Sequence, residues 1–506
     1  MKLELTGHNY QYAAEQIMTV LFPGEKPVYG PVGPEDEDWA RIRLSVGGTY
    51  AVAVTVLHRA GKETRGESRV RACRLEEDAL ARDRLGQRIV KLSFFKAAAA
   101  LTGQRPPWGA LTGIRPARLV TQMLQRGMTE GQAVAEMTRE LFVSPRRARL
   151  CLSTARASRK AEADLLPEDI SLYVGIPFCP TRCAYCSFVS ASVEKTFSMM
   201  EPYVDALIGE ISLMGESVRR LGLRIKSVYM GGGTPTTLPA PLMARLLNAL
   251  ETHFDLSSLA EYTVEAGRPD TVTAEKLAVL KAYGVSRVSI NPQTMEDRVL
   301  QAIGRRHTAA DVLRAMDIAQ KSGIPHINMD LIAGLPEDTA AGFRRSLDSC
   351  IALAPSNITV HTLALKKGAR ILLDGLAVPP AEAVREMLDY AEERLTAAGY
   401  APYYLYRKKY MSGNFENVGW SLPGAEGLYN IYIMEELHTI LSLGAGGSTK
   451  MVDPRRGYIE RYFNCKFAKE YMEKPEKLRA DRQHFETFMG GLMASYRAGE
   501  GSSADG

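Results

Sequence analysis

The sequence predicts an α/β protein built around a partial, TIM-like (β/α)6 barrel, with an α+β region before the barrel and a mainly helical region after it. Two observations carry this prediction. Short apolar segments and helical patterns alternate six times between residues 164 and 377, and such alternation is typical of a parallel sheet. The first apolar segment also runs directly into a loop with three cysteines, and sites on barrels lie on the loops that follow the strands.

The first region, residues 1–163, is expected to form an accessory α+β domain. Apolar residues alternate on either side of Gly47 and Gly48, which predicts a β-hairpin. Strands are expected over residues 2–6, 40–46 and 50–57. Helical patterns cover residues 10–21, 76–101, 117–125 and 130–142. Basic residues crowd the end of this region, and such a cluster is more typical of a solvated helix face than of an RNA site.

The second region, residues 164–377, is the expected barrel. Its strands are predicted over residues 171–175, 227–230, 262–265, 287–291, 327–332 and 358–362. Its helices are predicted over residues 202–221, 241–253, 274–283, 309–322 and 340–353. Six strand–helix units in series favour an open, six-stranded parallel barrel.

The third region, residues 378–480, is expected to be a C-terminal domain. It contains a predicted helix over 382–398, an aromatic-rich stretch over 400–420 and a glycine-rich run over 443–448. The aromatic side chains Tyr403, Tyr404 and Tyr406 are interpreted as core packing. Residues 481–506 are expected to form a partly disordered tail, because the last residues are rich in glycine, serine and aspartate.

The composition is that of a globular protein outside the membrane. The chain has 506 residues, of which 45% are hydrophobic and 24% charged, and a net charge of +5, which does not demand a nucleic-acid partner. An odd number of cysteines, seven, without a regular framework fits a reducing compartment. The N-terminus has no signal-peptide pattern, and no apolar run reaches the length of a membrane span. We expect a cytoplasmic protein with no membrane partner.

The most informative motif is a loop in which Cys179, Cys183 and Cys186 stand in the spacing C-x3-C-x2-C. Three thiolates brought to one point can hold three irons of a [4Fe–4S] cube and leave the fourth iron open. The chemistry suggests S-adenosylmethionine as the molecule that binds the open iron. A structural zinc site is the alternative, but such sites usually need four ligands, and no further cysteine or histidine follows closely after Cys186.

Further candidate ligand contacts follow the later strands. Gly231–Gly233 follow the second strand, and glycine backbone can pass close to a ligand and clasp its polar ends. Glu265 ends the third strand, where its carboxylate can accept hydrogen bonds from a cationic ligand. Gln293 follows the fourth strand, and Arg305 beyond it could hold a ligand carboxylate. Asp330 lies within an apolar strand, where an unpaired charge is costly, so a ligand-facing role is expected.

The motifs taken together resemble those of a known superfamily. The cysteine loop, GGGTPT, VEAGRPDT, INPQT and INMDLIAGLP are similar to the motifs of radical S-adenosylmethionine (SAM) enzymes. More narrowly, they resemble the HemN-like family of oxygen-independent coproporphyrinogen III oxidases. The segment Trp108–Pro116 and the additional N-terminal domain resemble the HemZ-type coproporphyrinogen dehydrogenase branch.

The resemblance implies a role for each matching position. Cys179, Cys183 and Cys186 would ligate the [4Fe–4S] cluster. Tyr173 would contact S-adenosylmethionine, and Tyr185 would pack on its adenine. The other positions that would line one or two S-adenosylmethionine molecules are Gly232, Gly233, Thr234, Glu265, Gln293, Arg305, Asp330 and Ala364. No residue is assigned a catalytic role beyond these contacts.

The resemblance also implies an activity, which is the oxygen-independent oxidative decarboxylation of coproporphyrinogen III to protoporphyrinogen IX in haem biosynthesis. The reduced cluster would cleave S-adenosylmethionine, and the 5′-deoxyadenosyl radical would take hydrogen from a propionate of the tetrapyrrole. An electron donor such as flavodoxin or ferredoxin is expected as a partner. Arg182, Arg268 and Arg306 are candidates to bind the substrate carboxylates.

One departure from the family pattern keeps other functions open. The position two residues beyond the third cysteine is Phe188, where characterised family members carry another cysteine. This form of the loop also resembles the haem-chaperone branch of the superfamily. The haem signature of that branch is not matched, because residues 428–433 contain neither its histidine nor its tryptophan. The alternatives are a haem-binding chaperone, a radical SAM haem-degrading methyltransferase and, more distantly, an RNA-modifying enzyme.

Overall fold

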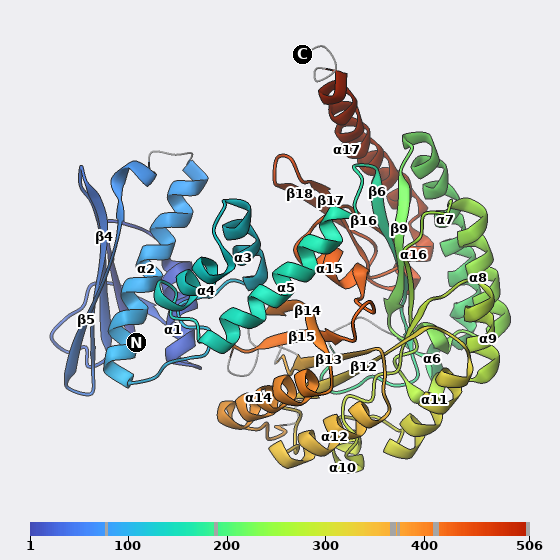
Figure 1. Cartoon of the computed structure of the whole chain (residues 1–506), viewed down its shortest axis with the longest axis horizontal. Helices are drawn as coiled ribbons and strands as arrows, with labels where there is room; N and C mark the ends of the chain where they lie inside the picture. Colours follow the sequence, from blue (N-terminus) through green and yellow to red (C-terminus); the bar gives the residue numbers. More distant parts are fainter. Residues whose placement is uncertain (76–78, 187–190, 365–370, 372–374, 408–413, 502–506) are drawn as a thin grey trace. The chain divides into compact units, whose positions relative to one another are not determined.

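The computed structural model describes residues 1–75, 79–186, 191–364, 371, 375–407 and 414–501. The chain divides into two compact units, Met1–Leu152 and Ser153–Gly506, which are described separately (Figure 1). Helix α5 (Pro145–Ala163) contains the boundary between them. None of the helices in these ranges combines the length and the apolar character that a membrane crossing requires.

The first unit is built on a five-stranded sheet in the order β2-β1-β3-β4-β5. Its strands are β1 (Lys2–Thr6), β2 (Val28–Tyr29), β3 (Trp39–Val46), β4 (Tyr50–Arg59) and β5 (Lys62–Arg71). The predicted strand at the N-terminus and the predicted hairpin are confirmed, since β3 and β4 pair antiparallel from Trp39–His58 to Val46–Ala51. Strand β5 was not predicted, and it extends this antiparallel pair into a meander.

The helices of this unit are α1 (Gln11–Leu21), α2 (Ala79–Thr102), α3 (Pro116–Gln125) and α4 (Glu130–Arg139), close to the predicted ranges. Helix α2 packs on the sheet, and α1 packs on α2. Helix α2 packs on β5 at Gly66, where an added Cβ would lie 2.1 Å from the carbonyl oxygen of Ser93. Thr129 and Gln132 cap the start of α4 with a reciprocal pair of hydrogen bonds.

The second unit contains an eleven-stranded sheet in the order β14-β15-β13-β12-β11-β10-β9-β6-β16-β17-β18. All six predicted barrel strands are present and neighbouring ones pair in parallel. They are β6 (Asp169–Ile176), β9 (Arg224–Gly232), β10 (Glu261–Glu265), β11 (Arg287–Ser289), β12 (His326–Ala333) and β13 (Asn357–Thr362). The predicted α/β fold with a partial barrel is therefore confirmed.

The helices that link these strands lie along the outer side of the sheet (Figure 1). They are α7 (Met200–Leu221), α8 (Ala240–His253), α9 (Ala274–Ala282), α11 (Ala309–Lys321) and α12 (Ala340–Ala352). Short elements lie between them: β7 (Phe178–Cys179), β8 (Ala191–Ser192), α6 (Val193–Thr196), α10 (Asp297–Ala302) and the 3-10 turns η3 (Pro235–Thr237) and η4 (Pro269–Thr271). Threonine side chains cap α9, α11 and α12 at Thr273, Thr308 and Thr339.

The C-terminal segment adds helices and strands to the same unit. Its helices are α14 (Ala381–Ala397), α15 (Leu428–Glu435), α16 (Ala468–Glu473) and α17 (Pro475–Gly501). Its strands are β14 (Ala401–Arg407), β15 (Glu416–Ser421), β16 (Ile440–Leu443), β17 (Ser448–Asp453) and β18 (Tyr458–Phe463). Strand β16 pairs in parallel with β6, and so provides a seventh parallel strand beside the first. Helix α17 covers most of the stretch expected to be a tail, and residues 502–506 lie outside the described part of the chain.

Buried polar contacts fix helix α15 to the starts of the barrel strands. The Glu261 carboxylate accepts a hydrogen bond from the Leu428 backbone at 2.7 Å, at the N-terminus of α15. It lies 3.6 Å from the Arg287 guanidinium, which donates to the carbonyl oxygen of Ala425 at 3.0 Å. Both charged side chains are buried. This anchoring places the tyrosines of α15 against the barrel strands.

Candidate active site

The cysteine loop begins at the end of strand β6. It lies beside the glycine turn, Gly231–Gly233, at the end of β9. Cys179 ends β7, and the Cys186 backbone donates a hydrogen bond to the Cys183 carbonyl oxygen at 3.1 Å. Two further backbone bonds, Gly233 to Ile176 and Thr234 to Phe178, both 2.7 Å, hold the loop to the glycine turn. Among the described residues, no three Cys, His, Asp or Glu side chains are close enough to hold a metal ion. Phe188, the position that departs from the family pattern, lies outside the part of the chain that the structure describes.

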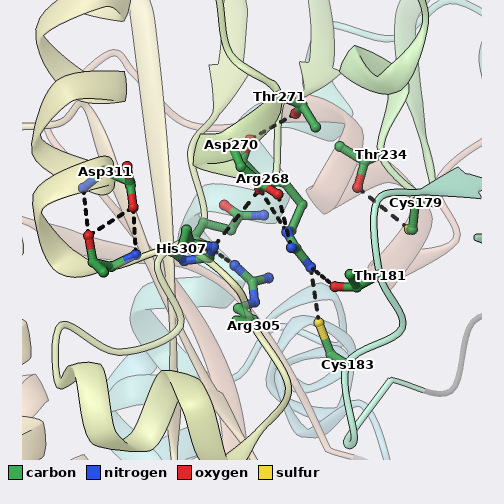
Figure 2. A network of polar contacts seen from close by, with 12 residues as sticks. Cys179, Thr181, Cys183, Thr234, Arg268, Asp270, Thr271, Arg305, His307 and Asp311 are labelled. Atoms are coloured by element: carbon green, nitrogen blue, oxygen red, sulfur yellow. Dashed lines mark hydrogen bonds and ion pairs between the residues drawn. The ribbon is translucent and has the colours of Figure 1, made fainter. Parts of the chain in front are cut away.

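Cys183 has a buried arginine as a polar partner (Figure 2). It is buried, and the Arg268 guanidinium donates a hydrogen bond to its sulfur at 3.6 Å. The Arg305 guanidinium also lies near enough to this thiol for its charge to act on it. The Cys179 sulfur instead lies 3.5 Å from the Thr234 hydroxyl. Two buried guanidinium groups therefore converge on one of the three sulfur atoms.

Side chains at Gly231 and Gly233 would collide with neighbouring atoms. A Cβ added at Gly233 would lie 2.4 Å from the carbonyl oxygen of Phe178, and one at Gly231 would lie 3.0 Å from the ring of Tyr229. Gly232 has φ of +108°, a conformation that side-chain-bearing residues rarely adopt. The three glycines thus bring strand β9 close to the cysteine loop.

Glu265 lies at the end of β10 and is bonded to a tyrosine of the neighbouring strand. The Tyr229 hydroxyl donates a hydrogen bond to the Glu265 carboxylate. Burial raises the pKa of Glu265 to about 7, the Tyr229 hydrogen bond opposes this, and the nearby Asp330 charge adds to it. Glu265 is thus a carboxyl group that changes its charge near neutral pH.

Asp330 lies within β12 and has partners of its own. Asn328 donates to one carboxylate oxygen at 2.8 Å, and His361 Nε2 lies 3.5 Å from the other. Burial alone would raise the pKa of Asp330, but the His361 and Asn328 interactions more than offset it, so the pKa lies below its ordinary value. At neutral pH, Asp330 is therefore ionised, whereas Glu265 is divided between its protonated and ionised forms.

Gln293 and Asn291 follow β11 and carry buried oxygen atoms that accept no hydrogen bond. The unpartnered atoms are Gln293 Oε1 and Asn291 Oδ1. Gln293 has φ of +68°, and its backbone bonds to Asp330 and Ile332 on both sides hold that conformation. Because buried acceptors usually find a donor, these two amides are positioned for a polar ligand.

Arg305 and Tyr185 form a second contact between the cysteine loop and the barrel. Arg305 donates to the Asn291 carbonyl oxygen at 2.6 Å and to the Tyr185 hydroxyl at 3.1 Å. Tyr185 packs against a buried apolar cluster that includes Leu363. Ala364, the next residue after Leu363, is half-buried beyond the end of β13.

Tyrosines fill the space between the site and helix α15. Tyr173 stacks on Tyr229 with ring centroids 6.3 Å apart, and Tyr229 stacks on Tyr429 of α15 at 4.5 Å. Tyr403 and Tyr404 belong to the same buried cluster, which confirms that the aromatic stretch is core packing.

Several of these partners were not found from the sequence. Tyr229 is the main one, and it stands in register with Tyr173 on the adjacent strand. Its position two residues before Gly231 places both on the same face of β9, so strand alternation carried a signal for it. Asn291 and His361 were also missed. Asn291 lies in the INPQT motif, from which only Gln293 was selected, and His361 lies in β13, in none of the quoted motifs.

The structure does not support Arg268 as a contact to substrate carboxylates. Its guanidinium is bonded to Asp270 at 3.0 and 3.1 Å and to the Thr181 hydroxyl at 3.0 Å, besides Cys183. Only 3% of the residue is exposed. Of the other two candidates, Arg182 is exposed, whereas Arg306 lines a cleft of about 380 Å³ together with Gly304 and His307.

The residues present fit an iron–sulfur cluster with a cationic organic ligand beside it. Thiols are the donors that such clusters use, and the buried guanidinium groups at Cys183 suit a thiolate. The glycine turn exposes backbone groups, and the buried Gln293 oxygen lacks a donor. Glu265 at the end of β10 and Asp330 within β12 supply negative charge. Cys179, Cys183 and Cys186 are the residues that could hold the cluster.

Comparisons with known proteins agree with this chemistry. A model of the radical SAM superfamily matches residues 173–350. The oxygen-independent coproporphyrinogen-III oxidase-like protein HemZ of Bacillus subtilis is 40% identical over 397 residues, which are 76% of this chain and 79% of that protein. The haem chaperone HemW of Escherichia coli is 27% identical over 325 residues, which are 63% of this chain and 81% of that protein. The solved coproporphyrinogen III oxidase HemN from Escherichia coli, a radical SAM enzyme, matches with a TM-score of 0.49 and 22% identity, over 64% of this chain and 72% of that one.

Proposed function

Since this chain belongs to the radical SAM superfamily and, within it, to the HemN-like family that contains HemZ, we propose that it is an oxygen-independent coproporphyrinogen III dehydrogenase. The family implies a [4Fe–4S] cluster and S-adenosylmethionine as cofactors. The observation that carries the proposal is the 40% identity to HemZ over 79% of that protein, together with a site whose residues fit both cofactors.

The chain's own residues divide the work of the site. When bound, the reduced cluster and S-adenosylmethionine supply a 5′-deoxyadenosyl radical that takes a hydrogen atom from the substrate. Cys179, Cys183 and Cys186 hold the cluster. Glu265, ionised beside a cationic ligand, accepts hydrogen bonds from it, while the backbone of Gly231–Gly233 contacts its polar end. The tyrosine cluster around Tyr229 excludes water.

The proposed substrate is a porphyrinogen with propionate side chains. Each of two propionates loses a hydrogen atom, one electron and carbon dioxide, and leaves a vinyl group. The bound cofactors would take up the hydrogen atom, and a one-electron acceptor would take up the electron. The proposed reductant of the cluster is a small electron carrier of the flavodoxin or ferredoxin type.

The test is an anaerobic turnover experiment. The full chain is reconstituted with iron and sulfide, reduced with dithionite, and incubated with S-adenosylmethionine, coproporphyrinogen III and an electron acceptor. We expect 5′-deoxyadenosine and a product lighter by two carbon dioxides and four hydrogen atoms, both measured by mass spectrometry. The variant Cys183→Ala should form neither product. Cleavage of S-adenosylmethionine without loss of carbon dioxide would reject the substrate but retain the cofactors.

A second candidate, a haem-binding chaperone, is favoured by the similarity to HemW. One structural feature supports the dehydrogenase over it: Tyr429 and Tyr432 in segment 428–433 are buried in the tyrosine cluster, and so are not available as ligands for haem. Stoichiometric haem binding, followed by absorption spectroscopy, with no decarboxylation of coproporphyrinogen III would favour the chaperone.

A further inference from the structure

Arg268 is the buried cation of the site that no substrate contact explains. It starts the η4 turn after β10, and 3% of it is exposed. All three nitrogens of its guanidinium are bonded: Nε and one terminal nitrogen to Asp270, and the other terminal nitrogen to both Thr181 and Cys183. Figure 2 shows the group lying between the carboxylate and the cysteine loop.

The paired bonds to Asp270 fix the direction of the guanidinium. A fork-to-fork contact holds the plane of an arginine more tightly than one bond does. The remaining terminal nitrogen, 3.0 Å from the Thr181 hydroxyl and 3.6 Å from the Cys183 sulfur, is therefore held toward the loop. The Asp270 carboxylate lies on the far side, so the positive end of this ion pair points at one cysteine.

We propose that Arg268 is a positioning residue that holds the cysteine loop through Thr181 and Cys183 and sets the reduction potential of the cluster through the Cys183 sulfur. The proposal rests on the proposed ligation of the cluster by Cys183, and it is independent of the substrate. Reduction adds one negative charge to the cluster, so a cation or a hydrogen-bond donor at a ligand sulfur stabilises the reduced form and raises the potential.

Substitution of Asp270 should shift the reduction potential in the direction opposite to substitution of Arg268. Its carboxylate partly cancels the charge of Arg268 at the cluster. Asp270→Asn keeps an oxygen that can accept from Arg268 but removes that negative charge, so the potential should rise. Arg268→Met removes the cation and keeps a side chain of similar length, so the potential should fall. Damage to the fold alone would not move the two potentials in opposite directions.

The experiment is a potentiometric titration of the reconstituted full chain, with the reduced cluster followed by electron paramagnetic resonance. Neither S-adenosylmethionine nor tetrapyrrole is present. We expect Arg268→Met to lower the equilibrium constant of one-electron reduction about tenfold, which corresponds to about 59 mV. Arg298→Met is the matched control, because its side chain is 69% exposed and pairs with Glu337, and its potential should equal that of the wild type.

The outcomes separate the inference from the proposed function. Equal potentials in wild type, Arg268→Met and Asp270→Asn, or shifts of the same sign in both variants, would overturn the role of Arg268 and leave the function untouched. If Arg268→Met loads no cluster, the Asp270→Asn titration decides by itself: a rise supports the proposal, and no rise overturns it. A wild-type chain that loads no cluster would overturn the proposed function first.

Discussion

The candidate site has two sides of opposite charge: arginines beside the cysteine loop, and the carboxyl groups Glu265 and Asp330. They differ in whether the protein itself supplies the oppositely charged partner. On the cysteine side, two arginines of the chain, Arg268 and Arg305, already face Cys183. On the carboxylate side, Glu265 has a tyrosine donor, and within the described ranges no arginine or lysine pairs with it. The protein thus supplies positive charge to the Cys183 sulfur from its own arginines. From the described residues it supplies none to Glu265, whose pKa is about 7, and this favours a cationic ligand beside that carboxyl group.

Among the changes considered, loss of a cysteine should reduce cluster content the most. Cys183→Ala removes a proposed iron ligand, so iron and sulfide content after reconstitution should fall to a small fraction of the wild-type value. Cleavage of S-adenosylmethionine should fall at least about 100-fold, because the electron for it comes through the cluster. Cys350→Ala is the control, since Cys350 is buried in α12, away from the loop, and should load normally. Normal loading of Cys183→Ala would contradict the assignment.

A methyl group at the glycine turn tests how closely the two sides are joined. In Gly233→Ala the new carbon would lie 2.4 Å from the Phe178 carbonyl oxygen, so the cysteine loop must shift. We expect cluster content and S-adenosylmethionine cleavage to fall about tenfold or more while circular dichroism stays unchanged. Gly209→Ala, where nothing lies within 4 Å on the exposed side of α7, should keep full activity and unfold at a slightly higher temperature.

The carboxylate side should show itself in the pH dependence of ligand binding. The ionised form of Glu265 is the one that attracts a cation, and its pKa is about 7. The affinity for S-adenosylmethionine, measured by anaerobic calorimetry, should therefore rise as the pH increases through about 7. Glu265→Gln should weaken binding at pH 8 about tenfold, the size of a lost charge-assisted hydrogen bond, and should flatten the profile.

Tyr229→Phe is the companion variant for this profile. Its hydroxyl lowers the pKa of Glu265, so its removal should move the midpoint of the affinity profile to higher pH. An unmoved midpoint would show that Glu265 is not the titrating group.

Glu210 is a buried glutamate outside the site whose pKa is similar to that of Glu265. Burial raises the pKa of Glu210 to about 7, opposed by hydrogen bonds from Tyr471 and Gly444. The folded chain holds the extra proton between the ordinary value of 4.5 and about 7, so this group costs stability as the pH rises through that window. Glu210→Gln can keep both bonds without the charge.

The expected result for Glu210→Gln is a higher free energy of unfolding at pH 8, by on the order of 1 kcal/mol, with little change at pH 4.5. Thermal unfolding at the two pH values measures it. Binding of S-adenosylmethionine should be unaffected, in contrast to Glu265→Gln. Destabilisation at pH 8 would mean that the ionised form is better paired than the contacts indicate.

The barrel and its cysteine loop were predictable because their signals are local. Each barrel strand is an apolar run bounded by polar residues, and the cysteines lie within eight residues of one another. Strand β5 was not predictable in this way. Its inward positions are Gly66 and Ser68, which fit under α2 but carry no apolar pattern. Strand β16 is short, and its pairing with β6 and β17 makes it part of the sheet.

The partners of the site residues needed the fold. Glu265 was expected to face a ligand, but its bond to Tyr229 depends on the register between β9 and β10, which the sequence does not specify. Arg268 was expected to bind a substrate carboxylate, since an arginine in a site motif suggests that use. Its real partner Asp270 is two residues away, and its contact with Cys183 joins segments 85 residues apart.

The pairing of β6 with β16 has a consequence for how the chain is made. Ser171 is bonded through its backbone to the Thr439 carbonyl oxygen, and its hydroxyl lies 2.8 Å from His438 Nε2. The ribosome adds these partner residues of the first barrel strand roughly 13–54 s after the strand itself, at about 5–20 residues per second. During that interval the cysteine loop is attached to a strand with an open edge. We expect nascent chains to depend on chaperones at this stage, and iron to be inserted only after release.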